Sequence, residues 1–127
     1  MSHRFEPQRG LIVVTAELKG PSGTALLRLA LDTGATSTLI NVSPLVAIGY
    51  DPAVAATRVE VTTGSGVEFA ARVILSKLTA LGGQRLDFPV LAHTLPPSAG
   101  VDGLLGLDFL RGLVLTVDFP SGRITLK

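Results

Sequence analysis

The sequence predicts an all-β fold: a small closed, barrel-like sheet with one or two short helices. Three observations support this prediction. The chain has 127 residues, which suits one domain. Its apolar residues gather in short runs rich in Val, Leu and Ile, which is typical of strands. Clusters of Gly, Pro and Ser separate these runs, as expected for tight turns. We therefore expect about eight short strands.

The first half of the chain predicts a hairpin, a short strand and a short helix. Residues 11–18 and 24–31 are aliphatic, and the link KGPSG between them consists of turn residues. Residues 37–41 form another short apolar strand. Ser43 is expected to cap a helix that has Pro44 at its first position and ends before a glycine.

The second half continues the strand pattern. Residues 57–63 and 66–78 are joined by a glycine-rich turn, and Val59 and Val61 alternate with charged residues. This alternation is typical of a strand with one solvated face. A pair of glycines then leads into a strand that begins at residue 84.

The C-terminal third predicts a loop, a helix and a hairpin. Residues 93–100 contain two successive prolines, which cannot continue a central strand. Residues 106–112 have the features of one or two helical turns, with Asp108 near the start and Arg111 near the end. Both charges complement the helix dipole there. The remaining residues are a strand, a Pro-Ser-Gly turn and a final strand.

Composition limits the classes of function. Residues 1–10 are polar and are expected to be a tail and a poor strand, followed by one domain over 11–127. The chain has no cysteine, so it forms neither disulfides nor thiolate sites. Its two histidines are distant in sequence, which disfavours metal-dependent hydrolysis. The apolar fraction of 46% is high for a small monomer and favours a subunit interface.

Charge and hydropathy bear on partners and location. The formal net charge is +1, and no basic run reaches three residues, so neither a nucleic acid nor an anionic membrane is an expected partner. No apolar segment approaches the roughly 20 residues that a membrane span needs, and no signal peptide is recognisable. We expect no membrane insertion and, by default, a cytoplasmic location, either as a whole protein or as the soluble domain of a longer one.

The most informative motif is Asp32-Thr33-Gly34, directly after the aliphatic run that ends at Leu31. A carboxylate in this place is costly unless it is paired, hydrogen-bonded or used. The simpler interpretation is a strand end capped by an Asx-type turn. Because another strand follows, we expect the carboxylate at the tip of a loop held between two packed strands.

Two further features follow this motif. A glycine-rich hairpin comes about thirty residues later. The residues at its tip are Thr63, Gly64, Ser65 and Gly66. Leu104, Leu105 and Gly106 then stand directly before the C-terminal helix. In this order, the features resemble the retropepsin-like aspartic peptidases, single-lobed relatives of pepsin, and a bacterial member is expected. The family motif of two apolar residues, Asp, Thr or Ser, Gly and Ala is matched by 30–35.

The resemblance implies a retropepsin fold, no cofactor, no metal and a set of residue roles. Asp32 would be the catalytic acid and base, supported by its loop neighbours. Thr33 would hydrogen-bond across a dimer axis, Gly34 would let the backbone approach the substrate, and Ala35 would complete the loop. The hairpin tip would be a flap that binds substrate. The apolar pair and the glycine before the helix would pack beneath the active loop.

Only one Asp-Thr-Gly motif occurs in the chain. The family chemistry needs two carboxyl groups that share one proton, so the second Asp32 must come from an identical chain across a two-fold axis. The expected function is that of a homodimeric aspartic endopeptidase acting on extended peptides. The alternative is a catalytically weak or inactive peptide-binding or dimerisation module of the same fold.

Three departures from the family pattern bear on this alternative. The hairpin carries neither Trp nor Tyr, so the aromatic flap contact of some relatives is missing. Leu107 and Asp108 stand where retroviral enzymes commonly carry an arginine. The polar N-terminus is a poor candidate for the terminal strands that retroviral dimers interleave. The dimer interface is therefore expected to be smaller or built differently.

Overall fold

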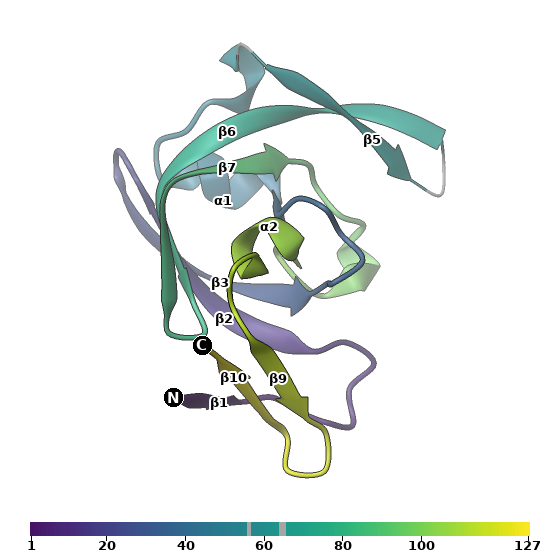
Figure 1. Cartoon of the computed structure of the whole chain (residues 1–127). Coiled ribbons are helices and arrows are strands. Elements are labelled where there is room, and N and C mark those ends of the chain that lie inside the picture. Colours follow the sequence, from purple (N-terminus) through teal and green to yellow (C-terminus); the bar gives the residue numbers. More distant parts are fainter. Residues whose placement is uncertain (56, 64–65) are drawn as a thin grey trace.

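The computed structural model describes residues 1–55, 57–63 and 66–127. Strands dominate it and form two sheets (Figure 1). The larger sheet consists of β2 (Val13–Gly20), β3 (Gly23–Leu31), β4 (Leu39–Ile40), β5 (Arg58–Thr63), β6 (Gly66–Ala80), β7 (Gly83–Ala92) and β8 (Gly103–Leu105). The smaller sheet consists of β1 (Ser2–Arg4), β9 (Leu115–Asp118) and β10 (Arg123–Leu126).

Six strands of the larger sheet close into a barrel. Its strand order is β2-β3-β8-β4-β7-β6-β5, and β2 also pairs with β6, which joins the two ends of the first six strands. β5 lies outside the ring, and its pairing among the described residues is with β6. The predicted all-β fold and closed sheet are confirmed, as are the hairpins β2–β3, β5–β6 and β6–β7.

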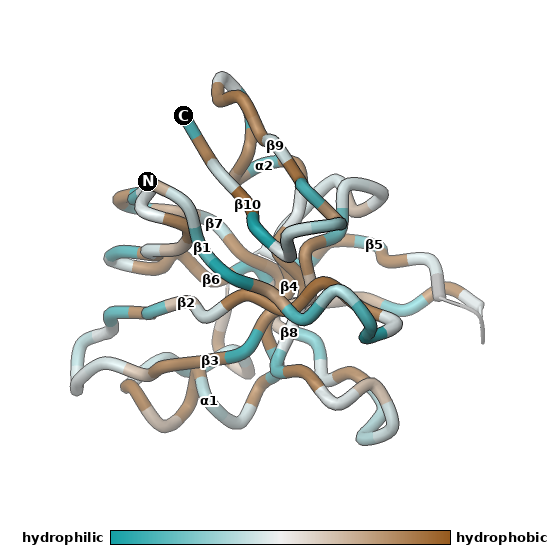
Figure 2. The backbone as a smooth tube through the Cα atoms, turned by 90° about the horizontal axis from the view of Figure 1, so that it is seen from below, coloured by the Kyte–Doolittle hydropathy of each residue, from teal (hydrophilic) through white to brown (hydrophobic). Residues whose placement is uncertain are grey.

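The barrel is filled by alternating apolar side chains. Along β2, Val14, Ala16 and Leu18 are buried, whereas the residues between them are exposed. The short helix α2 (Leu107–Leu110) brings Phe109 into the core, where it is fully buried and meets Phe88 edge to face at 6.0 Å between ring centroids. Figure 2 shows hydrophobic segments around β4 and β8, in the middle of the molecule.

β8 was not predicted from the sequence. Its three residues lie between β3, to which they run parallel, and β4, to which they run antiparallel. A side chain at Gly103 would collide with the Leu39 carbonyl, so only glycine fits between these strands. A strand this short has no periodicity of its own, and its partners on both sides define it.

The other helix, α1 (Val42–Ala47), begins earlier than predicted. Asn41 precedes it and Ser43 lies inside it, so the prediction of Ser43 as the cap is wrong. Contacts with the segment after β7 hold this end: Asn41 Oδ1 accepts from Leu95 N at 2.9 Å, and Val42 N donates to Thr94 Oγ1 at 3.2 Å. Tertiary hydrogen bonds therefore replace the local cap. Two single-turn 3₁₀ helices, η1 (Pro52–Val54) and η2 (Pro97–Ala99), complete the helical elements described.

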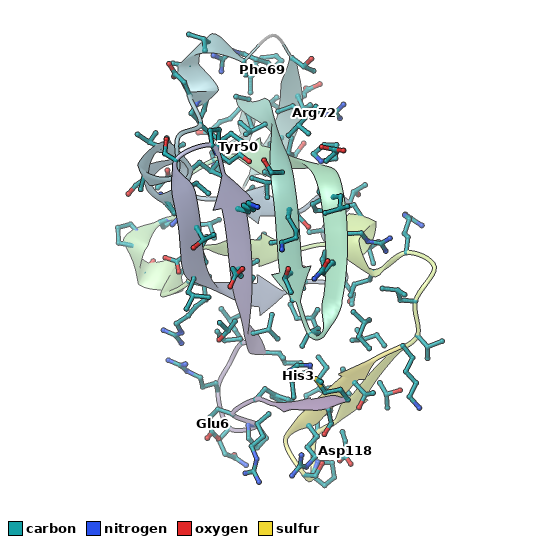
Figure 3. The ribbon with its side chains drawn as sticks, turned by 90° about the vertical axis from the view of Figure 1, so that its left-hand side faces the viewer. His3, Glu6, Tyr50, Phe69, Arg72 and Asp118 are labelled. Carbon is teal, nitrogen blue, oxygen red and sulfur yellow. The ribbon has the colours of Figure 1, made fainter. Side chains whose placement is uncertain are left out.

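The N-terminal residues, predicted to be a poor strand, form β1. This strand pairs antiparallel with β10, whose other edge pairs with β9. Phe5 follows it, is 8% exposed and meets Phe119 edge to face at 5.8 Å. Backbone pairing and this aromatic anchor stabilise a strand whose side chains are polar. Figure 3 shows the small sheet at one end of the barrel.

None of the helices in the described residues has both the length and the apolar character to cross a membrane.

Candidate active site

Asp32 lies immediately after β3, where the chain leaves the barrel wall. Its backbone N donates to Leu105 O at 2.9 Å and so continues the parallel pairing of β3 with β8 by one more hydrogen bond. The residue is half-buried. The carboxylate is therefore carried by the end of a strand that is paired on both sides, which is a rigid support.

The loop that carries Asp32 is held by its own backbone. Gly34 N donates to Asp32 Oδ1 at 2.9 Å, and Ala35 N donates to Asp32 O at 3.1 Å. This is the Asx-type turn of the simpler interpretation. One carboxylate oxygen is thus oriented, while Oδ2 has no hydrogen bond within the described part of the chain. A Cβ at Gly34 would lie 3.2 Å from Asp32 Oδ1, a crowded contact, so glycine also protects the orientation of the carboxylate.

The segment 104–106 supports this loop from below. Leu105 is fully buried, Leu104 is half-buried and Gly106 is buried. A Cβ at Gly106 would lie 2.8 Å from Ser37 C and 2.9 Å from Ala35 O. The next residue continues this contact, since its backbone N donates to Ala35 O at 2.8 Å. The structure therefore places these residues directly against the loop.

Asp108 has a tertiary role that was not predicted, since it was interpreted as a helix-end charge. Its Oδ1 and Oδ2 accept from Thr38 N at 3.0 and 2.9 Å, and Oδ1 also accepts from Thr38 Oγ1 at 2.7 Å. Thr38 Oγ1 in turn accepts from Gly106 N at 3.1 Å. Thr38 is fully buried and stands directly before the apolar pair Leu39 and Ile40. Asp108 thereby ties α2 to the strand that leaves the loop.

Asp102 is hydrogen-bonded to the backbone of β3. Its Oδ2 accepts from Arg28 N at 2.9 Å, and its backbone N donates to Arg28 O at 2.8 Å. Asp102 therefore pairs with β3 at Arg28, directly before the β3–β8 pairing begins and several residues before Asp32.

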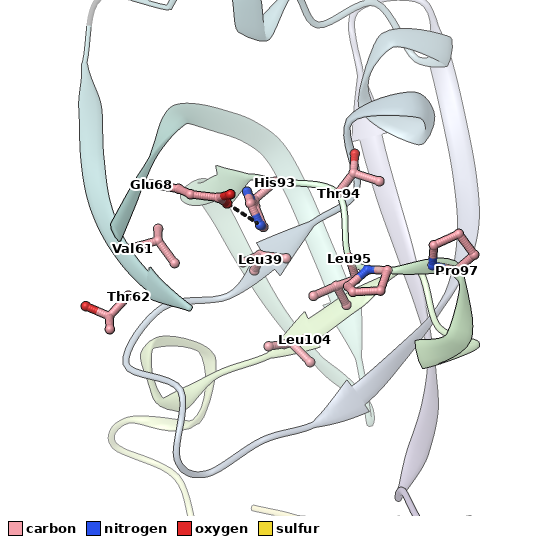
Figure 4. A pocket seen from close by; sticks show the side chains of 10 residues that line it. Leu39, Val61, Thr62, Glu68, His93, Thr94, Leu95, Pro97 and Leu104 are labelled. Carbon is pink, nitrogen blue, oxygen red and sulfur yellow. Dashed lines mark ion pairs between the residues drawn. The ribbon is translucent and has the colours of Figure 1, made fainter. Parts of the chain in front are cut away.

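A pocket of about 750 Å³ lies between the β5–β6 hairpin and the strands beside the loop (Figure 4). Leu39 and Leu104, which are partners in the β4–β8 pairing, belong to its lining. Its remaining lining residues are Val61, Thr62, Glu68, His93, Thr94, Leu95, Pro96 and Pro97. Leu104 also pairs with Ala30, two residues before Asp32, so the pocket shares its strands with the loop. The lining is mainly apolar, and Glu68 and His93 contribute an ion pair at 3.3 Å.

The predicted hairpin tip is described only in part. Thr63 and Gly66 form the last pair of the β5–β6 ladder, and Gly66 has φ +125°, which favours glycine. Gly64 and Ser65 lie outside the described residues.

Thr33 is exposed and is not among the lining residues of the pocket of about 750 Å³. It borders a shallow depression formed with α2 and the chain leading into β9. The other residues of this depression are Leu107, Leu110, Arg111, Gly112, Leu113 and Leu115. Val114 beside it is 64% exposed, so the surface around Thr33 is largely apolar.

The described residues contain no group of three or more His, Cys, Asp or Glu side chains that could hold a metal ion.

Comparison with known proteins agrees with this geometry. The sequence matches the aspartyl protease family over residues 14–109, more than half of the chain. Curated proteins give no match. Among solved structures, the crystal structure of a retropepsin-like aspartic protease from Rickettsia conorii is similar, with a TM-score of 0.69 and 16% sequence identity. That match covers 99% of this chain and 90% of the other. The chain therefore belongs to the aspartyl protease family and has the retropepsin-like fold.

Proposed function

We propose that the protein is a homodimeric aspartic endopeptidase in which each chain supplies one Asp32 to a shared pair of carboxyl groups. The observation that carries the proposal is the position of Asp32. It stands on a loop held by β8 and α2, with one oxygen oriented by Gly34 and the other without a hydrogen bond from the described residues. The chain has one such motif, so a second copy must supply the partner carboxyl group.

The chemistry follows from bringing two carboxyl groups together. They cannot both ionise cheaply at hydrogen-bonding distance, so they share one proton, as aspartic proteases generally do. The ionised oxygen takes a proton from the attacking water, and the protonated oxygen donates to the peptide carbonyl. In each chain the Gly34 N–H holds one carboxylate oxygen, which reduces the number of orientations that the pair samples.

The surface around Thr33 is the interface that we propose. It adjoins the catalytic loop, so a two-fold axis there brings the two Asp32 side chains together. Its apolar residues, Leu113 and Val114 among them, are 37% and 64% exposed in one chain. β1 already pairs with β10 of its own chain, which argues against a dimer formed by interleaved terminal strands.

We further propose that an extended peptide binds under the β5–β6 hairpin, which would act as the flap. Unpaired strand edges recognise extended peptides through backbone hydrogen bonds, and pockets read alternate side chains. The pocket of about 750 Å³ beneath the hairpin is mainly apolar, so it favours a large apolar substrate side chain.

The proposal is tested by cleavage of a complex peptide mixture at several pH values, with wild type and Asp32→Asn compared at concentrations where the solution mass is known. Cleavage by the wild-type dimer and its loss in the variant are expected. A variant that cleaves at the wild-type rate would contradict the assignment of Asp32.

The second candidate is a peptide-binding or dimerisation module with little or no turnover. Phe69, the aromatic residue of the described hairpin, favours it. Phe69 is 68% exposed and is the cross-strand partner of Glu60, whereas the pocket residues Val61 and Glu68 form the neighbouring pair. Side chains of successive pairs point to opposite faces, so Phe69 lies on the face of the hairpin opposite Glu68. A verified dimer from which bound peptides are recovered intact would support this candidate.

A further inference from the structure

We propose that the ion pair between His93 and Glu68 positions the β5–β6 hairpin over the pocket. The proposed effect of the ion pair on the hairpin does not depend on the protein being a peptidase. Its effect on peptide cleavage rests on the proposed peptidase function.

The hairpin projects beyond the barrel, so side-chain contacts with the barrel determine its orientation. The pairing of β6 with β7 ends at Ala71 and Ala92. Before Ala71, the pairings of β6 within the described residues are with β5, so residues 58–63 and 66–70 extend from the sheet as two paired strands, which we call the arm (Figure 1). A two-stranded hairpin without further packing is only marginally stable in water. The orientation of this arm therefore depends on contacts between its side chains and the barrel.

The ion pair joins the residue after β7 to the middle of the projecting arm. His93 directly follows the last residue of β7, and its Nε2 lies 3.3 Å from Glu68 Oε2 (Figure 4). The backbone of His93 is fixed, because its N donates to Ile40 O at 3.0 Å. The His93 side chain is 22% exposed and that of Glu68 is 50% exposed. A ring on a backbone held by β4 thus contacts Glu68, within the arm's part of β6.

The other hydrogen bonds that are described for the arm hold its base. Arg72 N donates to Thr57 O at 2.9 Å, which extends the β5–β6 ladder. Arg58 Nη2 approaches Ala53 O at 3.4 Å, beside η1. Neither contact reaches the pocket wall formed by 93–97. The ion pair, by contrast, joins the two walls that a substrate side chain must enter between.

Among the residues described as lining the pocket, no other charged side chain competes with the contact between His93 and Glu68. The other lining residues of the pocket, on β4, β5, β8 and 94–97, are not titratable. Glu60 on β5 is paired with Phe69 and so faces the opposite side of the arm. Arg72 on β6 lines a separate pocket that includes Asp108. The contact is an ion pair only when His93 is protonated.

Hydrogen exchange of the arm's backbone amides tests the proposal without reference to catalysis. Glu68→Gln removes the charge but keeps the shape, and Glu60→Gln is the matched control on the opposite face of the same arm. At one mildly acidic pH, we expect Glu68→Gln to lose protection by up to about fivefold, the range of a partly exposed ion pair. Glu60→Gln should leave protection unchanged. Glu68→His combined with His93→Glu restores the pair in reverse and should restore protection.

Equal protection in Glu68→Gln and Glu60→Gln would overturn the proposal. Peptide hydrolysis by the same proteins adds a second readout: Glu68→Gln should raise KM by up to about fivefold, and kcat should change less. If no protein in the series cleaves peptide, the proposed peptidase function fails. The exchange comparison still decides whether the ion pair positions the hairpin, so the two failures are distinguishable.

Discussion

Asp108 and Thr38 are joined by three hydrogen bonds although 70 residues separate them. Both carboxylate oxygens accept from Thr38 N, and Oδ1 also accepts from the Thr38 hydroxyl at 2.7 Å. Thr38 is fully buried and lies between the loop that carries Asp32 and β4. The contact therefore fastens the outgoing end of this loop to α2.

Removing this acceptor is expected to destabilise the fold. Asp108→Ala leaves two buried donors of Thr38 without a partner, which costs about 1–3 kcal/mol in the free energy of unfolding. Urea denaturation measures this change. Glu17→Ala removes an exposed carboxylate from β2 and should change stability by less than about 0.5 kcal/mol. A similar small change for Asp108→Ala would show that the contact does not hold the loop.

The substitution Gly106→Ala tests the close packing beneath the loop. A methyl group there would lie 2.8 Å from Ser37 C and 2.9 Å from Ala35 O, both backbone atoms that cannot rotate away. We expect Gly106→Ala to cost about 1–3 kcal/mol, the usual range for overpacking. Thermal unfolding provides the measurement. The control is Gly10→Ala, where an added Cβ has open space, and it should leave the melting temperature nearly unchanged.

The substitution Thr33→Ala tests the proposed dimer interface. Its side chain is exposed in one chain and is expected to be hydrogen-bonded across the two-fold axis. Thr33→Ala should raise the dimer dissociation constant about thirtyfold, since the two-fold axis repeats the hydrogen bond and each copy contributes about 1 kcal/mol. Sedimentation equilibrium measures this constant. Thr36→Ala, also exposed and on the same loop, is the matched control. Equal dissociation constants for both variants would place the interface elsewhere.

The sequence predicted those parts of the fold that depend on neighbouring residues. The hairpins β2–β3 and β6–β7 follow from aliphatic runs around turn residues, and both are present. The motif at Asp32 also led to the correct family, because Leu104 to Gly106 follow it at the family's spacing. Each of these signals is a short run of residues whose type and order can be read in one sequence.

The rest depends on partners that are distant in sequence. β8 is defined by β3 and β4 on either side, and β1 by the free edge of β10. The cap of α1 is replaced by hydrogen bonds to Thr94 and Leu95. Asp108 resembled an ordinary helix-end charge until Thr38 was placed beside it. Local propensity does not reveal such pairings, since tertiary contacts create them.

The central claim is that two chains share one catalytic pair of Asp32 side chains. It is tested most directly by adding Asp32→Asn to a fixed amount of wild type, under conditions where both are dimeric and exchange subunits, and measuring peptide cleavage. Random pairing at equal concentrations leaves about half of the wild-type chains in wild-type dimers. We therefore predict that cleavage falls to about half, and further as more variant is added. Cleavage that does not change when the variant is added would contradict a shared pair and assign the activity to a single chain.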